Sequence, residues 1–239
     1  MPTVGSHVPN AARIKDFISM ITKCNCSETL DALYHEVLER SSDSNVDSSM
    51  ALTKTQAEIM GDLFLNVAVL QTVISLLESG VKALFFYDFD FFNPDSWGPS
   101  LKLHFKVATH STDVAYVFGL GINYDFTFTL DDIKMLNQTT TLWTNFVKIN
   151  SDTHSVQVIV DQIGSQPPLA RRALQSDPNG NQLQRSSPST WEQTTRENPE
   201  SHFSLSLSPG MKSEFKDKRP LMFLKLRGAK HNGSCQCRT

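Results

Sequence analysis

His110 is the residue of this 239-residue chain whose type and setting best suit acid–base chemistry. It lies in the segment Val-Ala-Thr-His-Ser-Thr-Asp-Val-Ala-Tyr-Val-Phe-Gly, residues 107–119, which follows a phenylalanine-rich stretch. Imidazole changes charge close to neutral pH, and loops that follow strand ends commonly carry catalytic side chains. A lone loop histidine is nevertheless more often a polar surface residue, so position alone does not establish catalysis.

Complete catalytic motifs of other kinds are missing from the 239 residues. They contain no G-x-S-x-G nucleophile elbow, no P-loop, no G-x-G-x-x-G and no H-E-x-x-H. Asp88 and Asp90 could bind a hard cation, but a turn at a strand end explains them more simply. We therefore expect no metal site and no cofactor.

Four cysteines form two C-x-C pairs, Cys24 with Cys26 and Cys235 with Cys237. Zinc sites usually space paired ligands more widely, and a disulfide across a single residue is strained. Unpaired thiols are the simplest interpretation; a cross-link between the two ends or a metal site remains an alternative.

Composition indicates an ordinary globular chain, with 39% hydrophobic and 20% charged residues. The net charge of −3 argues against a dedicated nucleic-acid-binding protein, which would carry a basic stripe. The N-terminus has no secretory leader pattern. The most apolar stretch, 63–77, contains four polar residues, so we expect it to be too short and too polar to span a membrane.

Two amphipathic helices are predicted near the N-terminus, one after Pro9 and one capped by Ser27. Each presents one apolar face: Ile14, Phe17, Ile18 and Ile21 in the first, and Leu30, Leu33, Tyr34, Val37 and Leu38 in the second. The polar stretch 41–49 is predicted to be a linker.

A long helix is predicted to begin at Thr53, which has capping-box spacing to Gln56. Gly80 suits a left-handed C-cap at its end. Apolar residues repeat every three or four positions and define its inward face: Leu63, Val67, Leu70, Ile74 and Leu77.

The phenylalanine-rich stretch 81–92 is predicted to be a strand that ends at Asn93-Pro94. One face carries Phe85, Tyr87, Phe89 and Phe91, and the other carries Leu84, Phe86, Asp88 and Asp90. The strand therefore becomes polar at its carboxyl end, where parallel sheets assemble their sites.

A second long helix is predicted over 129–148, with Thr129 and Asp132 in a capping box. Its inward stripe is predicted as Ile133, Leu136, Thr140, Trp143 and Val147. A short strand at 202–207 and a charged helix near 211–217 complete the predicted elements.

The histidine segment closely resembles the cholinesterase and type B carboxylesterase family. There the catalytic histidine sits in the pattern G-A-x-H-x-x-(E/D)-Φ-x-Y-(V/I)-F, with Φ apolar. The matching residues of this chain are Ala108, His110, Asp113, Val114, Tyr116, Val117 and Phe118. Val107 stands where the family usually has glycine, and a β-branched residue resists positive φ, so the loop is expected to sit differently.

Further blocks resemble the family in the same order along the chain. They are Gly61-Asp62 with Phe64; Tyr87, Phe89, Asp90, Asn93 and Pro94; residues 139–148; Trp191-Glu192; Asn198-Pro199-Glu200; and residues 211–219. Together the blocks cover most of 51–148 and 189–223.

The resemblance implies an α/β fold, in which this chain is the C-terminal segment of an α/β-hydrolase, mostly helical, with few strands and an incomplete sheet. We divide it into a helical N-terminal stretch (1–50), a hydrolase segment with the histidine loop (51–149), a disordered insertion or loop (150–188) and the remaining hydrolase C-terminus and tail (189–239). The segment 150–188 is polar and interrupts what is a short turn in relatives, so translated non-coding sequence is an alternative.

The resemblance also implies a role for His110 as the general base of a serine esterase. The family's serine elbow and oxyanion loop belong to an earlier portion, so we expect the chain to be inactive alone. Expected partners are a small-molecule ester and the missing N-terminal half, with no nucleic acid and no membrane span. A non-catalytic adhesion or binding domain and a truncated gene product are the alternatives.

Asn25, Asn137 and Asn232 head glycosylation sequons. The full-length family is largely secreted or lumenal, whereas this chain shows no leader, so its localisation stays open.

Overall fold

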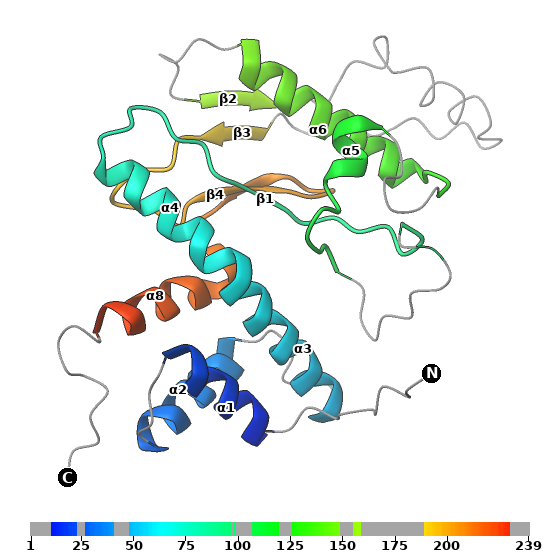
Figure 1. Ribbon diagram of the computed structural model, residues 1–239. Helices are drawn as coiled ribbons and strands as arrows, with labels where there is room; N and C mark the ends of the chain where they lie inside the picture. Colours follow the sequence, from blue (N-terminus) through cyan, green and yellow to red (C-terminus); the bar gives the residue numbers. More distant parts are fainter. Residues whose placement is uncertain are drawn as a thin grey trace. The chain divides into compact units, whose positions relative to one another are not determined.

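The computed structural model describes residues 11–22, 27–40, 48–96, 98, 107–119, 126–148, 155–158 and 189–229. The chain divides into two compact units (Figure 1). Unit 1 comprises Met1–Gly80 and Glu214–Thr239, and unit 2 comprises Val81–Ser213. The four cysteines, Asn25 and Asn232 lie outside the described residues.

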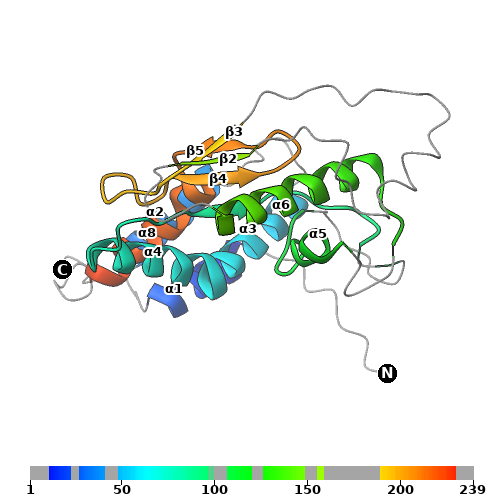
Figure 2. The same ribbon diagram turned by 90° about the horizontal axis from the view of Figure 1, so that it is seen from above.

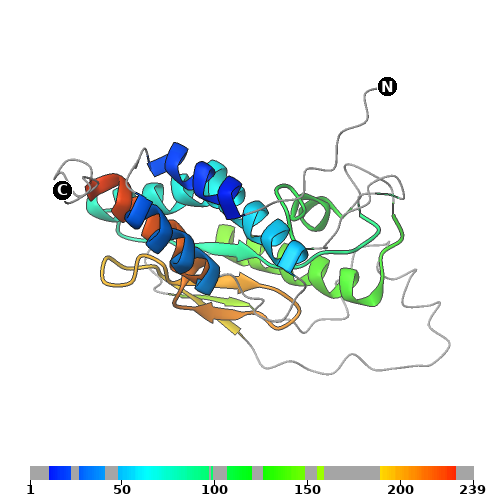
Figure 3. The same ribbon diagram turned by 90° about the horizontal axis from the view of Figure 1, so that it is seen from below.

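Unit 1 is helical in its described part. Its elements are α1 (Ala11–Thr22), α2 (Ser27–Arg40), α3 (Ser48–Gly61), a π-helical turn (Asp62–Asn66), α4 (Val67–Glu78), a 3-10 turn (Phe215–Lys218) and α8 (Arg219–Ala229). α1 packs against α2, and α8 packs against α4 and α1, so the helices α1 and α8, far apart in the sequence, share one core (Figures 1 and 3). That core is built from Ile14, Ile18, Leu33, Tyr34, Val37, Ile59, Val67, Met222 and Phe223.

The predicted long helix is longer than expected and is continuous through three helical segments. It begins at Ser48, so the prediction of Thr53 as its N-cap was wrong, and the last part of the predicted linker is helical. Val67, Leu70, Val73 and Leu77 are buried, whereas Leu63 and Ile74 are half-buried. The π-helical turn inserts an extra residue per turn, which changes the inward register there.

Gly80 ends this helix as predicted. Its φ is 88°, and its amide donates to the carbonyl of Leu77 at 3.2 Å. Glycine adopts this left-handed conformation without a steric penalty.

The helical run Ala51–Glu78 meets the length and composition expected of a membrane span. It has 28 residues; the mean hydropathy of its most apolar 18-residue window is 1.7, and 28% of that window is buried. It is thus longer than the stretch 63–77 considered in the sequence. A core helix passes the same test, so length and composition alone do not place it in a membrane.

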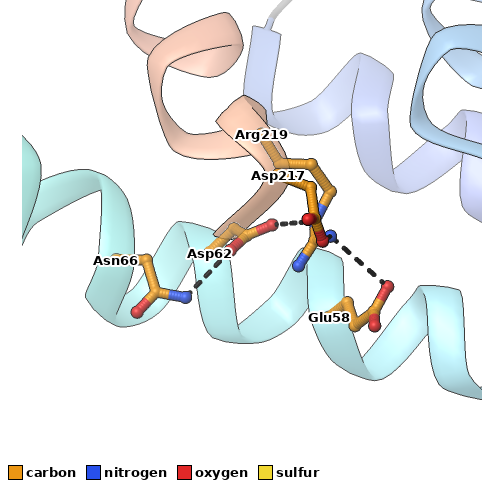
Figure 4. A network of polar contacts seen from close by, with 5 residues as sticks. All are labelled: Glu58, Asp62, Asn66, Asp217 and Arg219. Atoms are coloured by element: carbon orange, nitrogen blue, oxygen red, sulfur yellow. Dashed lines mark hydrogen bonds and ion pairs between the residues drawn. The ribbon is translucent and has the colours of Figure 1, made fainter. Parts of the chain in front are cut away.

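A buried ion pair joins the π-helical turn to the start of α8 (Figure 4). Arg219 Nε donates to Asp62 Oδ2 at 2.7 Å, and Asn66 Nδ2 donates to Asp62 Oδ1 at 2.8 Å. Arg219 Nη1 lies 3.2 Å from Asp217 Oδ2 and 3.7 Å from Glu58 Oε2. Burial raises the pKa of Asp62, although Arg219 acts in the opposite direction. Burial lowers the pKa of Arg219, but the neighbouring carboxylates of Asp62, Glu58 and Asp217 outweigh it, so that the pKa is raised.

Unit 2 contains a small mixed sheet with helices. Its described elements are β1 (Tyr87–Phe89), α5 (Val114–Phe118), α6 (Leu130–Lys148), β2 (Ser155–Val158), β3 (Ser189–Glu192), β4 (His202–Leu205) and β5 (Gly210–Lys212). β1 pairs in parallel with β4, with Tyr87 opposite Phe203, and β4 pairs antiparallel with β5. β2 and β3 form a separate antiparallel pair. Figure 2 shows both sheets in a second view. The prediction of a mostly helical α/β segment with few strands is confirmed.

The core of unit 2 brings α6 together with residues of β3 and β4. It consists of Ala115, Tyr116, Met135, Leu136, Leu142, Trp191, Phe203 and Leu205, with the predicted face Phe85, Tyr87, Phe89 and Phe91 packed against it. The buried Trp191 Nε1 donates to the carbonyl of Phe86 at 2.9 Å. This bond ties β3 to the segment that leads into β1.

Several predicted boundaries were wrong, in unit 2 and at the start of α8 in unit 1. The strand expected over 81–92 is regular only at 87–89, although Leu84 and Phe86 carbonyls and the Asp90 amide still bond to neighbouring segments. Residues 210–212 form β5 where a charged helix was expected, and the helix begins later, at Arg219. Pairing between distant segments, which local sequence does not report, fixes these limits.

The capping box of α6 is confirmed, but its predicted inward stripe is only partly right. Ile133 and Leu136 are buried, whereas Trp143 is 37% exposed and Val147 is 80% exposed. The helix buries a neighbouring stripe that includes polar side chains: Asp132, Met135, Gln138, Thr139 and Leu142. An apolar-only pattern misses this stripe because it excludes polar residues from the core.

The segment 150–188 is described only at Ser155–Val158, which forms β2 and pairs with β3 from Val158 opposite Ser189. Its remaining residues lie outside the described part of the chain, so the division of the sequence into four segments stays a prediction.

Candidate active site

His110 occupies a tight turn in unit 2. The Thr112 amide donates to the Thr109 carbonyl at 3.1 Å, and the Thr112 hydroxyl donates to the same oxygen at 2.8 Å. His110 and Ser111 are therefore the two central residues of this turn. The histidine is exposed.

Ser111 adopts a left-handed backbone, with φ 70°. Such a conformation costs a non-glycine residue roughly 1–2 kcal/mol and persists only where surrounding bonds determine it. From the sequence, an altered loop backbone is expected at Val107, where the family usually has glycine. In the structure the loop residue with a positive φ is Ser111, next to the histidine.

The turn continues directly into α5. The Tyr116 amide donates to the Asp113 carbonyl at 2.9 Å, and the Gly119 amide donates to the Ala115 carbonyl at 2.9 Å. Gly119 ends the helix with φ 74°. Residues 109–119 thus form one continuous hydrogen-bonded segment, and α5 packs beside α6 (Figure 1).

The buried carboxylate of Asp132 binds donors from three separate elements. Tyr116 OH donates to Oδ1 at 2.6 Å. Oδ2 accepts from Asn93 Nδ2, from the Thr129 amide at 2.7 Å and from the Thr129 hydroxyl at 2.6 Å. These bonds connect α5, the end of the β1 segment and the N-terminus of α6, where the helix dipole favours a negative charge.

Aromatic rings enclose the Tyr116 side chain, which is 1% exposed. The rings of Phe89 and Phe91 lie 5.4 Å from its centroid, and Phe128 lies 5.8 Å away. Burial raises the pKa of the Tyr116 hydroxyl, and the hydrogen bond to Asp132 adds to the effect. Tyr116 therefore remains a neutral donor to the Asp132 carboxylate.

Asp113 faces the β1 segment through Tyr87. The Tyr87 hydroxyl lies 3.5 Å from Asp113 Oδ2, at the outer limit of a hydrogen bond. Burial, with a smaller contribution from Asp113, raises the pKa of Tyr87 to about 12. The acidic position of the histidine pattern thus contacts β1.

The structure does not bring Asp88 and Asp90, the candidate cation ligands, together with the histidine. Asp90 pairs with Lys212 at 3.6 Å, and Asp88 is half-buried in β1. Among the described residues, no group of three or more histidine, cysteine or acidic side chains is arranged to hold a metal ion. Within that same part of the chain, no hydrogen bond or ion pair of the His110 imidazole is found.

β4 buries two polar residues to which the sequence assigned no role. His202 is 2% exposed, and its Nδ1 donates to the Glu200 carbonyl at 2.8 Å. Ser204 is 1% exposed, and its hydroxyl bonds to none of the described residues. They alternate with the core residues Phe203 and Leu205, a pattern that normally predicts a solvated face.

Comparison with known proteins decides the family. The sequence profile described as "Carboxylesterase family" matches residues 6–223. The chain belongs to the carboxylesterase family. Membership implies the α/β-hydrolase fold that the resemblance predicted, and residues 6–223 include the whole His110 segment.

One curated relative is an esterase, "Esterase cest-33" of Caenorhabditis elegans. It is 34% identical over 144 residues, which is 59% of this chain and 24% of that protein. The chain therefore spans about a quarter of the length of this curated esterase.

Proposed function

We propose that His110 is the general base of a carboxylic-ester hydrolase and that this chain supplies it to a serine carried outside the 239 residues. The observation that supports this most directly is the segment 107–119. It has the residue pattern of the family's catalytic histidine, and its imidazole is exposed on a turn fixed to three elements of unit 2.

In this role the imidazole would take the proton of the serine hydroxyl as the oxygen attacks the ester carbonyl. It would then return that proton to the leaving alcohol, and water would repeat the sequence on the acyl-enzyme. Backbone N–H groups would hold the oxyanion. The substrate is expected to be a small-molecule ester.

A first experiment treats the purified chain with a fluorophosphonate probe and with p-nitrophenyl butyrate. Because the sequence has no nucleophile elbow, we expect no probe labelling and no hydrolysis beyond that of His110→Gln. Covalent labelling of a serine in this chain would contradict the proposal that the nucleophile lies elsewhere.

A second experiment co-expresses the chain with a carboxylesterase N-terminal segment that carries a G-x-S-x-G elbow. We expect ester hydrolysis to appear and to fall by roughly 10⁴-fold or more in His110→Gln, as when a triad histidine is removed. His35→Gln is the matched control, because His35 is an exposed histidine on α2. Full activity of the His110→Gln complex would overturn the catalytic role and favour a binding domain.

A further inference from the structure

We propose that Asp132 is the positioning residue of the His110 loop: its buried carboxylate fixes α5, and through α5 the catalytic turn, against the end of β1 and the start of α6. This inference rests on the proposed role of His110. It assigns Asp132 a function beyond the capping box that its sequence spacing predicts.

The first argument is the number and origin of the donors. A capping box requires only the exchange between Thr129 and Asp132, which is complete here because the Asp132 amide also donates to the Thr129 hydroxyl at 3.3 Å. The additional bonds from Tyr116 and Asn93 come from residues 16 and 39 positions away. A helix cap alone has no need of these two bonds.

The second argument is the path from Asp132 to the histidine. Tyr116 lies six residues after His110, and both its ends are held, the ring by aromatic neighbours and the hydroxyl by Asp132. Hydrogen-bonded turns link Thr109 to Tyr116 without a break. A shift of Tyr116 therefore displaces the turn that presents the imidazole.

The third argument is the opposite end of the network. Asn93 is 4% exposed, and its Oδ1 accepts from the Asp95 amide at 2.8 Å while its Nδ2 donates to Asp132. The turn that ends the β1 segment is thereby fixed to the same carboxylate. Asp132 sets the position of the histidine turn relative to the sheet, and not only relative to α6.

The test uses Asp132→Asn and Tyr116→Phe, with Thr139→Val as the matched control. An asparagine cannot accept from all four donors, and phenylalanine removes only the bond to α5. Thr139 is 1% exposed on the same helix, and its hydroxyl bonds to none of the described residues, so valine keeps its shape without touching the network.

The first readout is amide hydrogen exchange of residues 109–119 in the full chain. A buried acceptor or donor left unpaired favours opening, so we expect exchange at the Thr112, Val114 and Tyr116 amides to be about tenfold faster in Asp132→Asn. Tyr116→Phe should show a smaller change in the same segment, and Thr139→Val none. Equal exchange in all four proteins would overturn the proposal, and Tyr116→Phe keeps this test valid if Asp132→Asn fails to fold.

The second readout is ester hydrolysis by the complex with the serine-bearing segment. A misplaced general base slows the chemical step, so we expect kcat to fall by roughly 10²-fold in Asp132→Asn with KM nearly unchanged. Asp132→Glu, which keeps a carboxylate at the third helical position, should recover part of kcat. If kcat per folded complex stays at the wild-type value, so that the loss of activity tracks only the amount of folded protein, the role of Asp132 is purely structural and the inference is overturned.

The two proposals fail in different ways. If His110→Gln stays active, the proposed function is wrong while the exchange experiment still reports whether Asp132 fixes the loop. If His110→Gln is inactive but Asp132→Asn matches Thr139→Val in exchange and in kcat, only the positioning role is wrong.

Discussion

At the scale of single residues, unit 1 depends on a charge pair that water does not reach. Asp62 is fully buried and Arg219 is 4% exposed, and they bind each other at 2.7 Å. Each ion is costly to bury alone, so the pair is stable only while both partners are present. Asn66 satisfies the other oxygen of Asp62 but carries no charge.

Arg219→Met is expected to lower the free energy of unfolding by about 3–5 kcal/mol, because it leaves the Asp62 carboxylate buried without a cation. Urea denaturation at neutral pH measures this. Lys218→Met is the control, since Lys218 pairs with Glu214 at the surface and such pairs contribute at most about 1 kcal/mol. Equal losses in both variants would show that the buried pair has no special role.

In the histidine loop, the contiguous residue pattern could be predicted from the sequence, whereas the long-range hydrogen bonds could not. The segment around His110 was identified from the sequence because its residue pattern is contiguous. Asp132 was identified only as a helix cap, because its other partners, Asn93 and Tyr116, are distant in sequence. Nothing in the local pattern reports bonds across such separations.

At the scale of elements, glycine marks where the long helix of unit 1 continues and where it ends. Gly61 has φ −58° within the helical run, whereas Gly80 has φ 88° at its end. An added Cβ would meet no atom within 4 Å at either position. The two glycines therefore differ in backbone conformation and not in the space available to a side chain.

Gly61→Ala is expected to stabilise unit 1 by about 0.5–1 kcal/mol, because alanine loses less backbone entropy in a helix. Gly80→Ala is expected to destabilise it by about 1–2 kcal/mol, because alanine resists the left-handed conformation. Thermal unfolding of both variants beside the wild type measures the pair. Changes of the same sign would contradict the helix boundaries described above.

Predictions of elements succeeded where the signal was local. The Thr129–Asp132 cap, the Gly80 end and the apolar faces of α1 and α2 all follow from residues within one or two helical turns. They failed at the π-helical turn and at β5, which depend on what packs or pairs with the segment.

At the scale of the whole molecule, the long helix of unit 1 leaves large apolar side chains in contact with solvent. They are Met60, Phe64, Leu65, Val69 and Leu76, and Phe64 is 70% exposed. Exposed apolar groups gathered on one element favour association with another surface. We therefore expect the isolated chain to self-associate in solution.

Phe64→Glu is expected to reduce this association, measured by static light scattering over a concentration series. The free energy of unfolding should change by no more than about 0.5 kcal/mol, because the side chain is exposed. Val147→Glu is the control, because Val147 is an exposed apolar residue on α6. If the two variants scatter as the wild type does, the exposed face of the long helix does not drive association.

The sequence by itself determined the family likeness, the histidine segment, the Thr129–Asp132 cap, the Gly80 helix end and the mostly helical character of the chain. Each of these depends on neighbouring residues, whose spacing acts directly on local backbone and side-chain bonds. Only the tertiary structure decided that α1 and α8 share one core, that α6 buries Asp132, Gln138 and Thr139, and that Asp132 binds Tyr116 and Asn93. Those outcomes depend on which distant segments pack together and exclude water. The periodicity of the sequence does not indicate which segments these are.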